Sequence, residues 1–240
     1  MFNLVETLYN NIFLNIYIND IICIKIGDTM LDQIINNFYF IRLLYLIIIV
    51  LIGISVINDL KSKDIAIDKY LNIKKINIGI LLKYLFLSFI VRIISEQLVI
   101  FIPFKTTDVQ IPSNFFELII EFIISCIFAS IFEEIIFRFG LYKVLNKRLN
   151  IYNSIIVTSI IFAAIHIYNI DGFTILLGIS LIWNYSFYKT NNLIYPILLH
   201  FFHNLYALSG NIFDYSNYWY IFLIISIIGY GLSLLKKQKH

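Results

Sequence analysis

Long apolar runs separated by short polar segments dominate this chain. Residues 43–57 carry no charge, and the run 115–132 carries only Glu117 and Glu121. About 20 apolar residues in a helix cross the hydrocarbon core of a bilayer. Backbone polar groups inside lipid must be satisfied within the protein, so such runs predict helices. The expected fold class is all-α, a polytopic transmembrane helical bundle.

The apolar pattern predicts seven spans, at residues 38–57, 79–102, 115–147, 151–168, 172–188, 193–209 and 218–235. Asparagines interrupt the apolar spacing of residues 1–37, which form either an interfacial segment or an eighth span. The chain is therefore divided into an N-terminal segment, 1–37, and one membrane bundle, 38–240. The span at 115–147 would be about 50 Å long and would extend beyond the bilayer.

Basic residues gather in every second connection between the predicted spans. Lys or Arg occurs at 58–78, 143–150 and 189–192 and in the C-terminal tail, whereas the other connections contain only Lys105. Basic loops stay on the cytoplasmic side of a membrane. We therefore expect an integral protein of the plasma membrane whose C-terminus is cytoplasmic.

The composition agrees with this class. The 240 residues are 60% hydrophobic and 14% charged, and the mean hydropathy is +0.85, whereas a soluble domain has about a quarter charged residues. A net charge of +3 is too small to indicate nucleic-acid binding, so the expected surroundings are the lipid bilayer. Cys23 and Cys126 are far apart and indicate neither a disulfide nor a thiolate metal site.

Three ionisable residues interrupt the apolar pattern at residues 132–138. Glu134 and Arg138 are four residues apart in the favourable acid-first order, and Glu133 lies about 100° around the helix. Ionisable groups at membrane depth mark a functional site or a partnered structural pair. Either all three form one ion cluster that holds helices together, or Glu134 and Arg138 neutralise each other and leave Glu133 for chemistry.

Other polar groups are expected at a similar depth. Counted at 1.5 Å per residue from the basic side, four side chains lie about 14 to 24 Å deep: Glu133, His166, His200 and Asn204. Taken alone, His166 would be explained as a core histidine, and His200 with Asn204 as an interhelical hydrogen-bond pair. Their shared depth favours an internal polar cavity that contains water.

These residue types fit the hydrolysis of an amide bond. Glu133 can act as a general base on water, with His166 sharing the proton. His200 and Asn204 can donate hydrogen bonds to an oxyanion. No serine or cysteine nucleophile motif is present. Zinc is an alternative, since Glu133, His166 and His200 form a suitable ligand set, although the chain lacks an HExxH sequence.

Three short motifs occur in order on separate predicted spans. EExxxR is found at 133–138, FxxxH at 162–166 and HxxxN at 200–204. In this arrangement the chain resembles the CPBP intramembrane protease family, the CAAX proteases and bacteriocin-processing enzymes also called Abi. The resemblance covers about residues 115–210, the protease-like core.

The resemblance implies a helical bundle with a conical cavity. It implies that Glu133 and His166 activate water, that His200 and Asn204 stabilise the oxyanion, and that supporting residues surround them: Glu134, Arg138 and Phe162. Both metal-dependent and metal-free glutamate mechanisms are considered for the family. Relatives remove the last three residues of prenylated proteins or are linked to bacteriocin maturation and self-immunity. The expected partner is thus a membrane-associated peptide or protein.

Two further polar features and two other functions are also consistent with this sequence. Arg92 and Glu96 form an i, i+4 pair that we interpret as a structural ion pair, and His203 is an extra imidazole that either competes as a ligand or packs. One alternative function is a non-catalytic membrane immunity or scaffold protein. The other is a proton-coupled transporter that uses the same polar groups as a relay.

Overall fold

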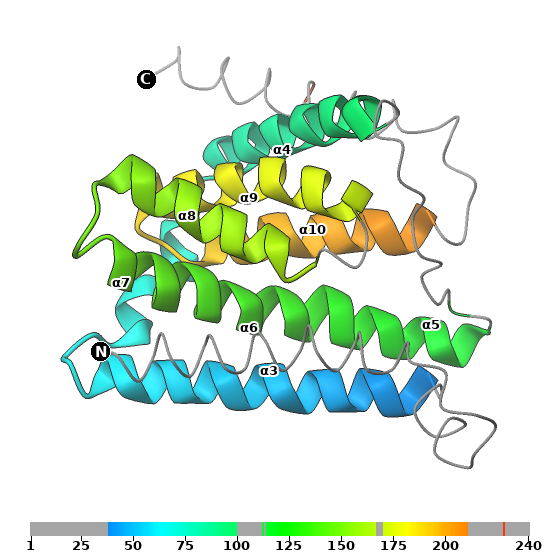
Figure 1. Cartoon of the computed structure of the whole chain (residues 1–240), viewed down its shortest axis with the longest axis horizontal. Helices are drawn as coiled ribbons and strands as arrows, with labels where there is room; N and C mark the ends of the chain where they lie inside the picture. The colour runs from blue at the N-terminus through cyan, green and yellow to red at the C-terminus, as the bar shows by residue number, and fades with distance from the viewer. Residues whose placement is uncertain (1–37, 100–111, 113, 167–169, 211–227, 229–240) are drawn as a thin grey trace.

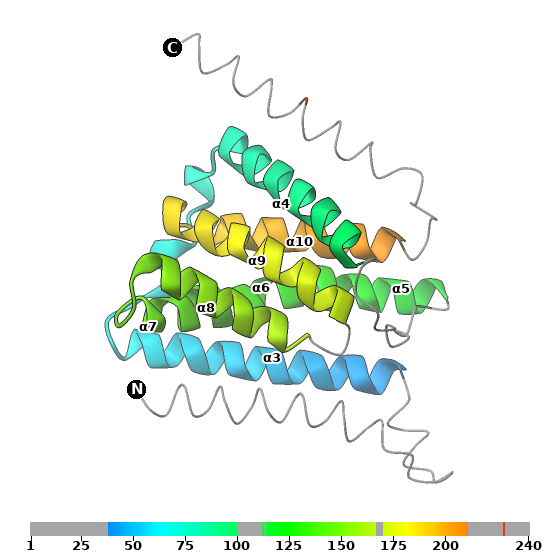
Figure 2. The same ribbon diagram turned by 45° about the horizontal axis from the view of Figure 1, so that its top comes forward.

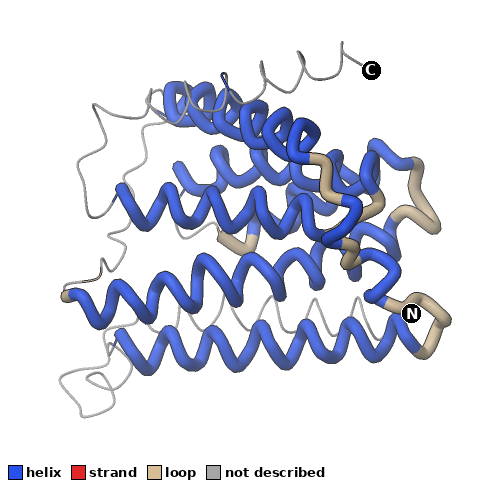
Figure 3. The backbone as a smooth tube through the Cα atoms, turned by 180° about the vertical axis from the view of Figure 1, so that it is seen from behind, coloured by secondary structure: helices blue, strands red, loops and turns tan. Residues whose placement is uncertain are grey.

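A computed structural model describes residues 38–99, 112, 114–166, 170–210 and 228 (Figure 1). Within these ranges the backbone consists of helices and loops, without strands (Figure 3). The helices are α3 (Phe38–Lys61), α4 (Ile78–Val99), α5 (Phe115–Glu121), α6 (Ser130–Glu134), α7 (Lys143–Leu145), α8 (Ile151–Ala164), α9 (Ile170–Thr190) and α10 (Ile194–Gly210). The all-α helical bundle is confirmed.

Among the described residues, three helices are long and apolar enough to cross a membrane, namely Tyr39–Lys61, Ile78–Glu96 and Phe115–Leu145, and Ile151–Ala164 is a shorter apolar helix. On α3, exposed apolar side chains recur along one face: Leu43, Ile47, Leu51 and Ile54. An apolar face of this kind is suited to lipid contact. Together these features indicate an integral membrane protein. The count of seven spans stays a prediction, because residues 1–37 and most of 218–235 lie outside the described part of the chain.

The helix ends differ from the predicted spans by a few residues. α3 continues to Lys61, and two short 3₁₀ turns, η1 (Ile67–Tyr70) and η2 (Ile73–Lys75), follow it. α8 ends at Ala164, so His166 lies in the turn after the helix rather than within it. Its backbone N–H closes that turn on the Ala163 carbonyl at 3.0 Å.

The predicted span 115–147 is one long helix with two widened segments. The side chain of Asn114 caps its start by accepting from the N–H groups of Phe116 and Glu117. The π-helical segments η3 (Phe122–Ala129) and η4 (Ile135–Tyr142) flank α6, and α7 is the last segment of the long helix. π-helical turns are rare in proteins, and those that occur are often found at functional sites. The residues Glu133 and Glu134 lie between them.

The helices pack in successive layers around this long helix (Figures 1 and 2). α3 lies along one side of it, α9 and α10 lie on the other side, and α4 is at the far edge. Two glycines allow the long helix and α3 to approach closely. A Cβ atom on Gly53 would lie 2.5 Å from Phe132 Cδ1, and one on Gly140 would lie 2.8 Å from Val56 Cγ1. Small residues at such contacts let membrane helices pack tightly.

Three of the connections that the sequence identified as basic meet at one end of the bundle. The Leu193 backbone N–H donates to the Tyr70 carbonyl at 2.7 Å, and the Asn192 side chain donates to the Asn72 carbonyl at 2.8 Å. Lys143 Nζ lies 3.4 Å from the centre of the Tyr70 ring. These contacts join the η1–η2 loop to α7 and to the α9–α10 turn, as the alternation of basic loops requires.

Candidate active site

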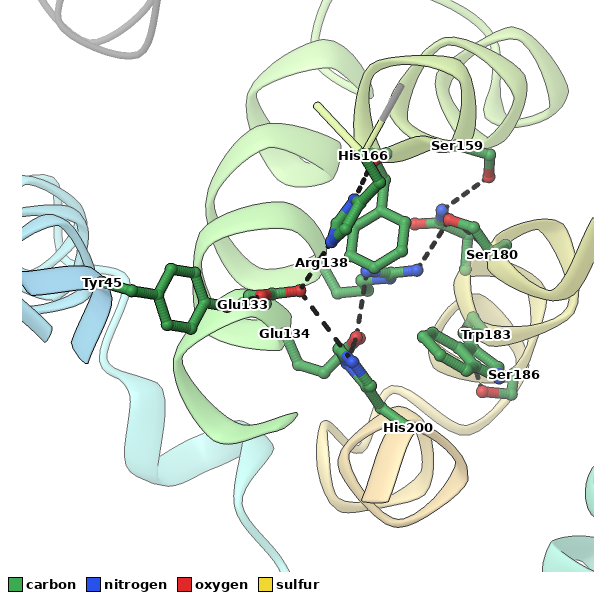
Figure 4. A network of polar contacts seen from close by, with 12 residues as sticks. Tyr45, Glu133, Glu134, Arg138, Ser159, His166, Ser180, Trp183, Ser186 and His200 are labelled. Atoms are coloured by element: carbon green, nitrogen blue, oxygen red, sulfur yellow. Dashed lines mark hydrogen bonds and ion pairs between the residues drawn. The ribbon is translucent and has the colours of Figure 1, made fainter. Parts of the chain in front are cut away.

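Glu133 is at the centre of a buried polar cluster (Figure 4). It lies on α6 and is only 5% exposed. Its Oε1 atom accepts a hydrogen bond from the hydroxyl of Tyr45, which comes from α3. Within the described structure, its Oε2 atom is buried and has no hydrogen-bond partner. The two oxygens of this carboxylate therefore have different surroundings.

Two imidazoles face the Oε2 atom of Glu133. His166, in the turn after α8, places Nε2 4.0 Å from it, and His200, on α10, places Nε2 3.9 Å from it. Figure 4 shows both rings directed at this carboxylate from opposite sides. The predicted association of Glu133, His166 and His200 is thus present as a geometric fact.

The other nitrogen of each ring has its own acceptor. His166 Nδ1 lies 2.8 Å from the Phe162 carbonyl oxygen, and His200 Nδ1 lies 2.8 Å from Glu134 Oε1. A carbonyl or an ionised carboxylate only accepts hydrogen bonds, so each Nδ1 carries the proton. In the neutral rings, both Nε2 atoms then present a lone pair toward Glu133.

Three acceptor atoms that face one another require a donor between them. A water molecule about 2.8 Å from two atoms separated by 3.9 to 4.0 Å would form both hydrogen bonds at an angle of about 90°. Buried polar atoms without protein partners commonly hold such a water. The geometry therefore suits a water molecule that donates to Glu133 and to an imidazole.

Glu134 and Arg138 form the predicted ion pair and also support a histidine. Arg138 Nη1 lies 3.0 Å from Glu134 Oε1, and both side chains are 0% exposed. Arg138 Nη2 donates to Ser180 Oγ at 2.7 Å. Since Glu134 Oε1 also accepts from His200 Nδ1, this pair orients one of the two imidazoles that face Glu133.

Aromatic rings enclose the cluster. Phe162 is fully buried, and its ring centre lies 5.0 Å from that of His166 and 5.9 Å from that of His200. The Arg138 guanidinium lies 4.5 Å from the Phe162 ring centre, within the range of a cation–π contact. Trp183 of α9 stacks on His200 with ring centres 4.6 Å apart. Phe162 thus contacts both imidazoles and Arg138, and its supporting role stays a prediction.

Asn204, on α10, contacts the long helix at a different level from Glu133. Its Nδ2 atom donates to the Ser125 carbonyl at 2.7 Å, within the π-helical segment η3. Ser125 precedes Glu133 by eight residues, which is about 12 Å of helical rise. His200 and Asn204 therefore have separate partners in this structure, and the oxyanion role of Asn204 stays a prediction.

His203 belongs to a second cluster, between α4 and α10. Its Nδ1 atom lies 3.1 Å from Arg92 Nη1, and Arg92 Nε lies 2.7 Å from Glu96 Oε1. The guanidinium is also 4.5 Å from the ring centre of Tyr206. The predicted Arg92–Glu96 pair is present, and His203 packs against it instead of facing Glu133.

The predicted metal ligands do not form a preassembled ion site. Among the described residues, no three His, Cys, Asp or Glu side chains are grouped so that they could hold a metal ion. Tetrahedral zinc with bonds of 2.0–2.1 Å would separate its ligand atoms by about 3.4 Å. The separations of 3.9 and 4.0 Å at Glu133 are wider, and the residues as placed do not fit the ion.

Sequence reasoning missed several residues of the site, among them Tyr45 and Trp183. Tyr45 is one of 17 tyrosines and lies in a span that had shown only apolar character. Trp183 lies in the span 172–188, to which no chemistry had been assigned. Neither residue belongs to a short motif. Only the packing of α3 and α9 against the long helix brings them to Glu133 and His200.

Comparison with known proteins gives one match. Residues 115–206 match the family model described as type II CAAX prenyl endopeptidase Rce1-like. No curated protein matches the chain, and no solved structure does. The matched segment contains Glu133, His166 and His200, whereas Tyr45 lies outside it.

Proposed function

We propose that this chain is an intramembrane endopeptidase that uses glutamate-activated water. The match of residues 115–206 to the Rce1-like CAAX prenyl endopeptidase model supports this proposal and confirms the resemblance to the CPBP family. The substrate is a peptide bond of a membrane-associated peptide or protein. The observation that carries the proposal is the buried Oε2 atom of Glu133, which faces the Nε2 atoms of His166 and His200.

The reaction begins with a water molecule between these three atoms. Glu133 takes a proton from the water through Oε2, and the resulting hydroxide attacks the carbonyl carbon of the scissile bond. General-base catalysis of this kind contributes about 10²- to 10⁴-fold to a rate. Burial of Glu133 places the charge transfer in a region of low dielectric, where fixed partners have strong effects.

The proton then moves to the leaving amine as the tetrahedral intermediate collapses. His166 is suited to this transfer because its Nδ1–H is held by the Phe162 carbonyl and its Nε2 faces Glu133. His200, when protonated, offers an Nε2–H donor to the oxyanion while Glu134 holds its Nδ1. Asn204 stays the second proposed oxyanion donor, and its amide, which donates to the Ser125 carbonyl, would have to turn from that carbonyl to reach the substrate.

Zinc or another divalent ion would use the atoms Glu133 Oε2, His166 Nε2 and His200 Nε2. Because these atoms are farther apart than a tetrahedral site requires, no step of the mechanism is assigned to a metal. The chain's own residues supply the base, the proton carrier and the oxyanion donors of the proposed reaction.

The substrate class follows from the family. A prenylated peptide that ends in a CAAX sequence is the first candidate, and a bacteriocin precursor or another membrane peptide is the second. In either case we place the enzyme in the plasma membrane, with its C-terminus in the cytoplasm. A role in bacteriocin self-immunity is compatible with the same cleavage.

The substitution Glu133→Gln tests the proposal. In the first measurement, the purified protein in proteoliposomes is given a farnesylated fluorogenic peptide that ends in a CAAX sequence. In the second, new peptide termini are compared in membranes of cells that express each variant. Glu133→Gln should lower the rate by about 10²- to 10⁴-fold, as expected for loss of a general base. Glu96→Gln is the matched control, because Glu96 lies in the Arg92 cluster.

Each outcome separates the proposed functions. Cleavage that continues in Glu133→Gln would remove the mechanism. Protection against a bacteriocin that persists in this variant, with no product from the wild-type protein, would indicate the immunity or scaffold function. Proton flux into liposomes without any peptide product would indicate the transporter.

A further inference from the structure

We propose that Tyr45 is a positioning residue of this active site. Its hydroxyl holds Oε1 of Glu133, so that Oε2 is the oxygen that faces water and the two imidazoles. The inference rests on the proposed endopeptidase function and extends it to a helix outside the segment matched by the family model, since Tyr45 lies on α3.

The contact is specific to one oxygen of one carboxylate. Within the described part of the chain, Tyr45 is the side chain that donates a hydrogen bond to Glu133. Figure 4 shows its ring reaching Glu133 from the side opposite Arg138 and Ser180. The neighbouring Glu134 has its own partners, Arg138 and His200. The two adjacent glutamates are therefore oriented by different helices.

The packing of α3 fixes the position of the tyrosine. Arg42, three residues before Tyr45, pairs with Glu121 of α5 at 2.6 Å. Eight residues after Tyr45, Gly53 allows α3 to approach Phe132 so closely that a Cβ atom would lie 2.5 Å from its ring. Tyr45 is thus held between two contacts of the same pair of helices, and its hydroxyl has little freedom to leave Glu133.

The carboxylate needs such a partner because it is buried. A buried charged oxygen without a hydrogen bond is costly. If the hydroxyl is removed, Oε1 loses its donor and the carboxylate can rotate so that the base no longer points to the imidazoles. A catalytic group must be held close to its productive geometry, and small displacements lower the rate strongly. Tyr45 therefore acts on the reaction through Glu133.

The test compares four variants in proteoliposomes with the farnesylated CAAX peptide as probe: Tyr45→Phe, Tyr45→Leu, Tyr84→Phe and Glu133→Gln. Tyr84 is the control, because it is buried in α4 and packs against Tyr185. Tyr45→Phe should lower kcat by about 10- to 100-fold, as expected for a lost hydrogen bond to a charged group, with KM unchanged within twofold. Tyr84→Phe should keep both constants.

The second variant separates orientation from packing. If the hydroxyl is the important group, Tyr45→Leu and Tyr45→Phe lose kcat to the same extent when rates are normalised to the monodisperse, folded fraction. A larger loss in Tyr45→Leu alone would assign the tyrosine to packing and overturn the inference. An increase in KM with kcat unchanged would also overturn it, because the residue would then contact substrate.

The two proposals can fail separately. A fully active Tyr45→Phe beside an inactive Glu133→Gln would overturn the role of Tyr45 and leave the endopeptidase in place. A fully active Glu133→Gln, or a wild-type protein that does not cleave the probe, would overturn the proposed function and the inference that depends on it.

Discussion

Two polar clusters in this bundle contain the same types of group and leave different atoms without hydrogen-bond partners. The cluster around Arg138 contains Glu134, His200 and Glu133, and the cluster around Arg92 contains Glu96 and His203. Each begins as an i, i+4 pair of Glu and Arg. The Arg92 guanidinium contacts the Glu96 carboxylate, the His203 imidazole and the ring of Tyr206.

The Arg138 cluster instead leaves three buried polar atoms without a hydrogen-bond partner in the described structure: Glu133 Oε2, Glu134 Oε2 and Arg138 Nε. Glu134 Oε1 pairs with Arg138 and also accepts from His200 Nδ1, which orients this imidazole toward Glu133. Because Glu133 is not required for that pairing, its Oε2 atom faces two imidazoles with no hydrogen-bond partner in the described structure. In the proposed mechanism, the Glu134–Arg138 ion pair stabilises the fold, whereas the second acid beside it, Glu133, supplies the catalytic base.

The largest effect is expected from Arg138→Met. Arg138 and Glu134 are both 0% exposed, so the substitution leaves a buried carboxylate without its guanidinium. Loss of one partner of a buried pair costs about 3–5 kcal/mol of unfolding free energy. Thermal unfolding in detergent should show a clear fall in Tm, and cleavage of the peptide probe should be abolished because His200 loses its oriented acceptor.

The double variant Glu134→Gln with Arg138→Met isolates the cause. It removes both charges, so it should recover most of the lost stability. A neutral amide is a weaker acceptor for the His200 Nδ1–H than a carboxylate, so cleavage should stay at least about tenfold below the wild type. A single Arg138→Met variant as stable as the wild type would show that the pair does not stabilise the bundle.

A smaller effect is expected from the same substitution in the second cluster. The Arg92 side chain is 16% exposed and that of Glu96 is 37% exposed, so water can compensate the carboxylate that remains. Arg92→Met should lower the unfolding free energy by about 1 kcal/mol and change kcat by less than twofold. A tenfold loss of kcat at unchanged Tm would instead place this cluster in the catalytic site.

The sequence predicted the helices well, because lipid allows few alternatives. Six of the seven predicted spans correspond to described helices within a few residues, including the long rod at Phe115–Leu145. Helix ends were less accurate because local turn geometry decides them. His166 was expected inside a helix and lies just beyond the end of α8.

The site could be predicted only where its residues share a helix or a motif. The i, i+4 rule identified Glu134 with Arg138, and the depth argument correctly grouped Glu133 with His166 and His200. The contact of Tyr45 with Glu133 could be predicted only from the distance between α3 and the long helix, and no local sequence pattern encodes that distance. The depth argument also grouped Asn204 with them, but depth does not specify direction, and the Asn204 amide is held by Ser125.

The smallest effect is expected from metal removal. A divalent ion could use the Glu133 cluster, where three acceptor atoms converge, but not the Arg92 cluster, where a guanidinium faces His203. Since the distances of 3.9 and 4.0 Å at Glu133 exceed the separation of about 3.4 Å in tetrahedral zinc, incubation of the purified protein with EDTA should leave kcat on the peptide probe unchanged. Loss of cleavage in EDTA that zinc restores would contradict this expectation. It would show that the ion draws the three side chains together, and the water at Glu133 would then be a metal ligand. As a control, the Arg92→Met protein assayed without EDTA should not show this loss.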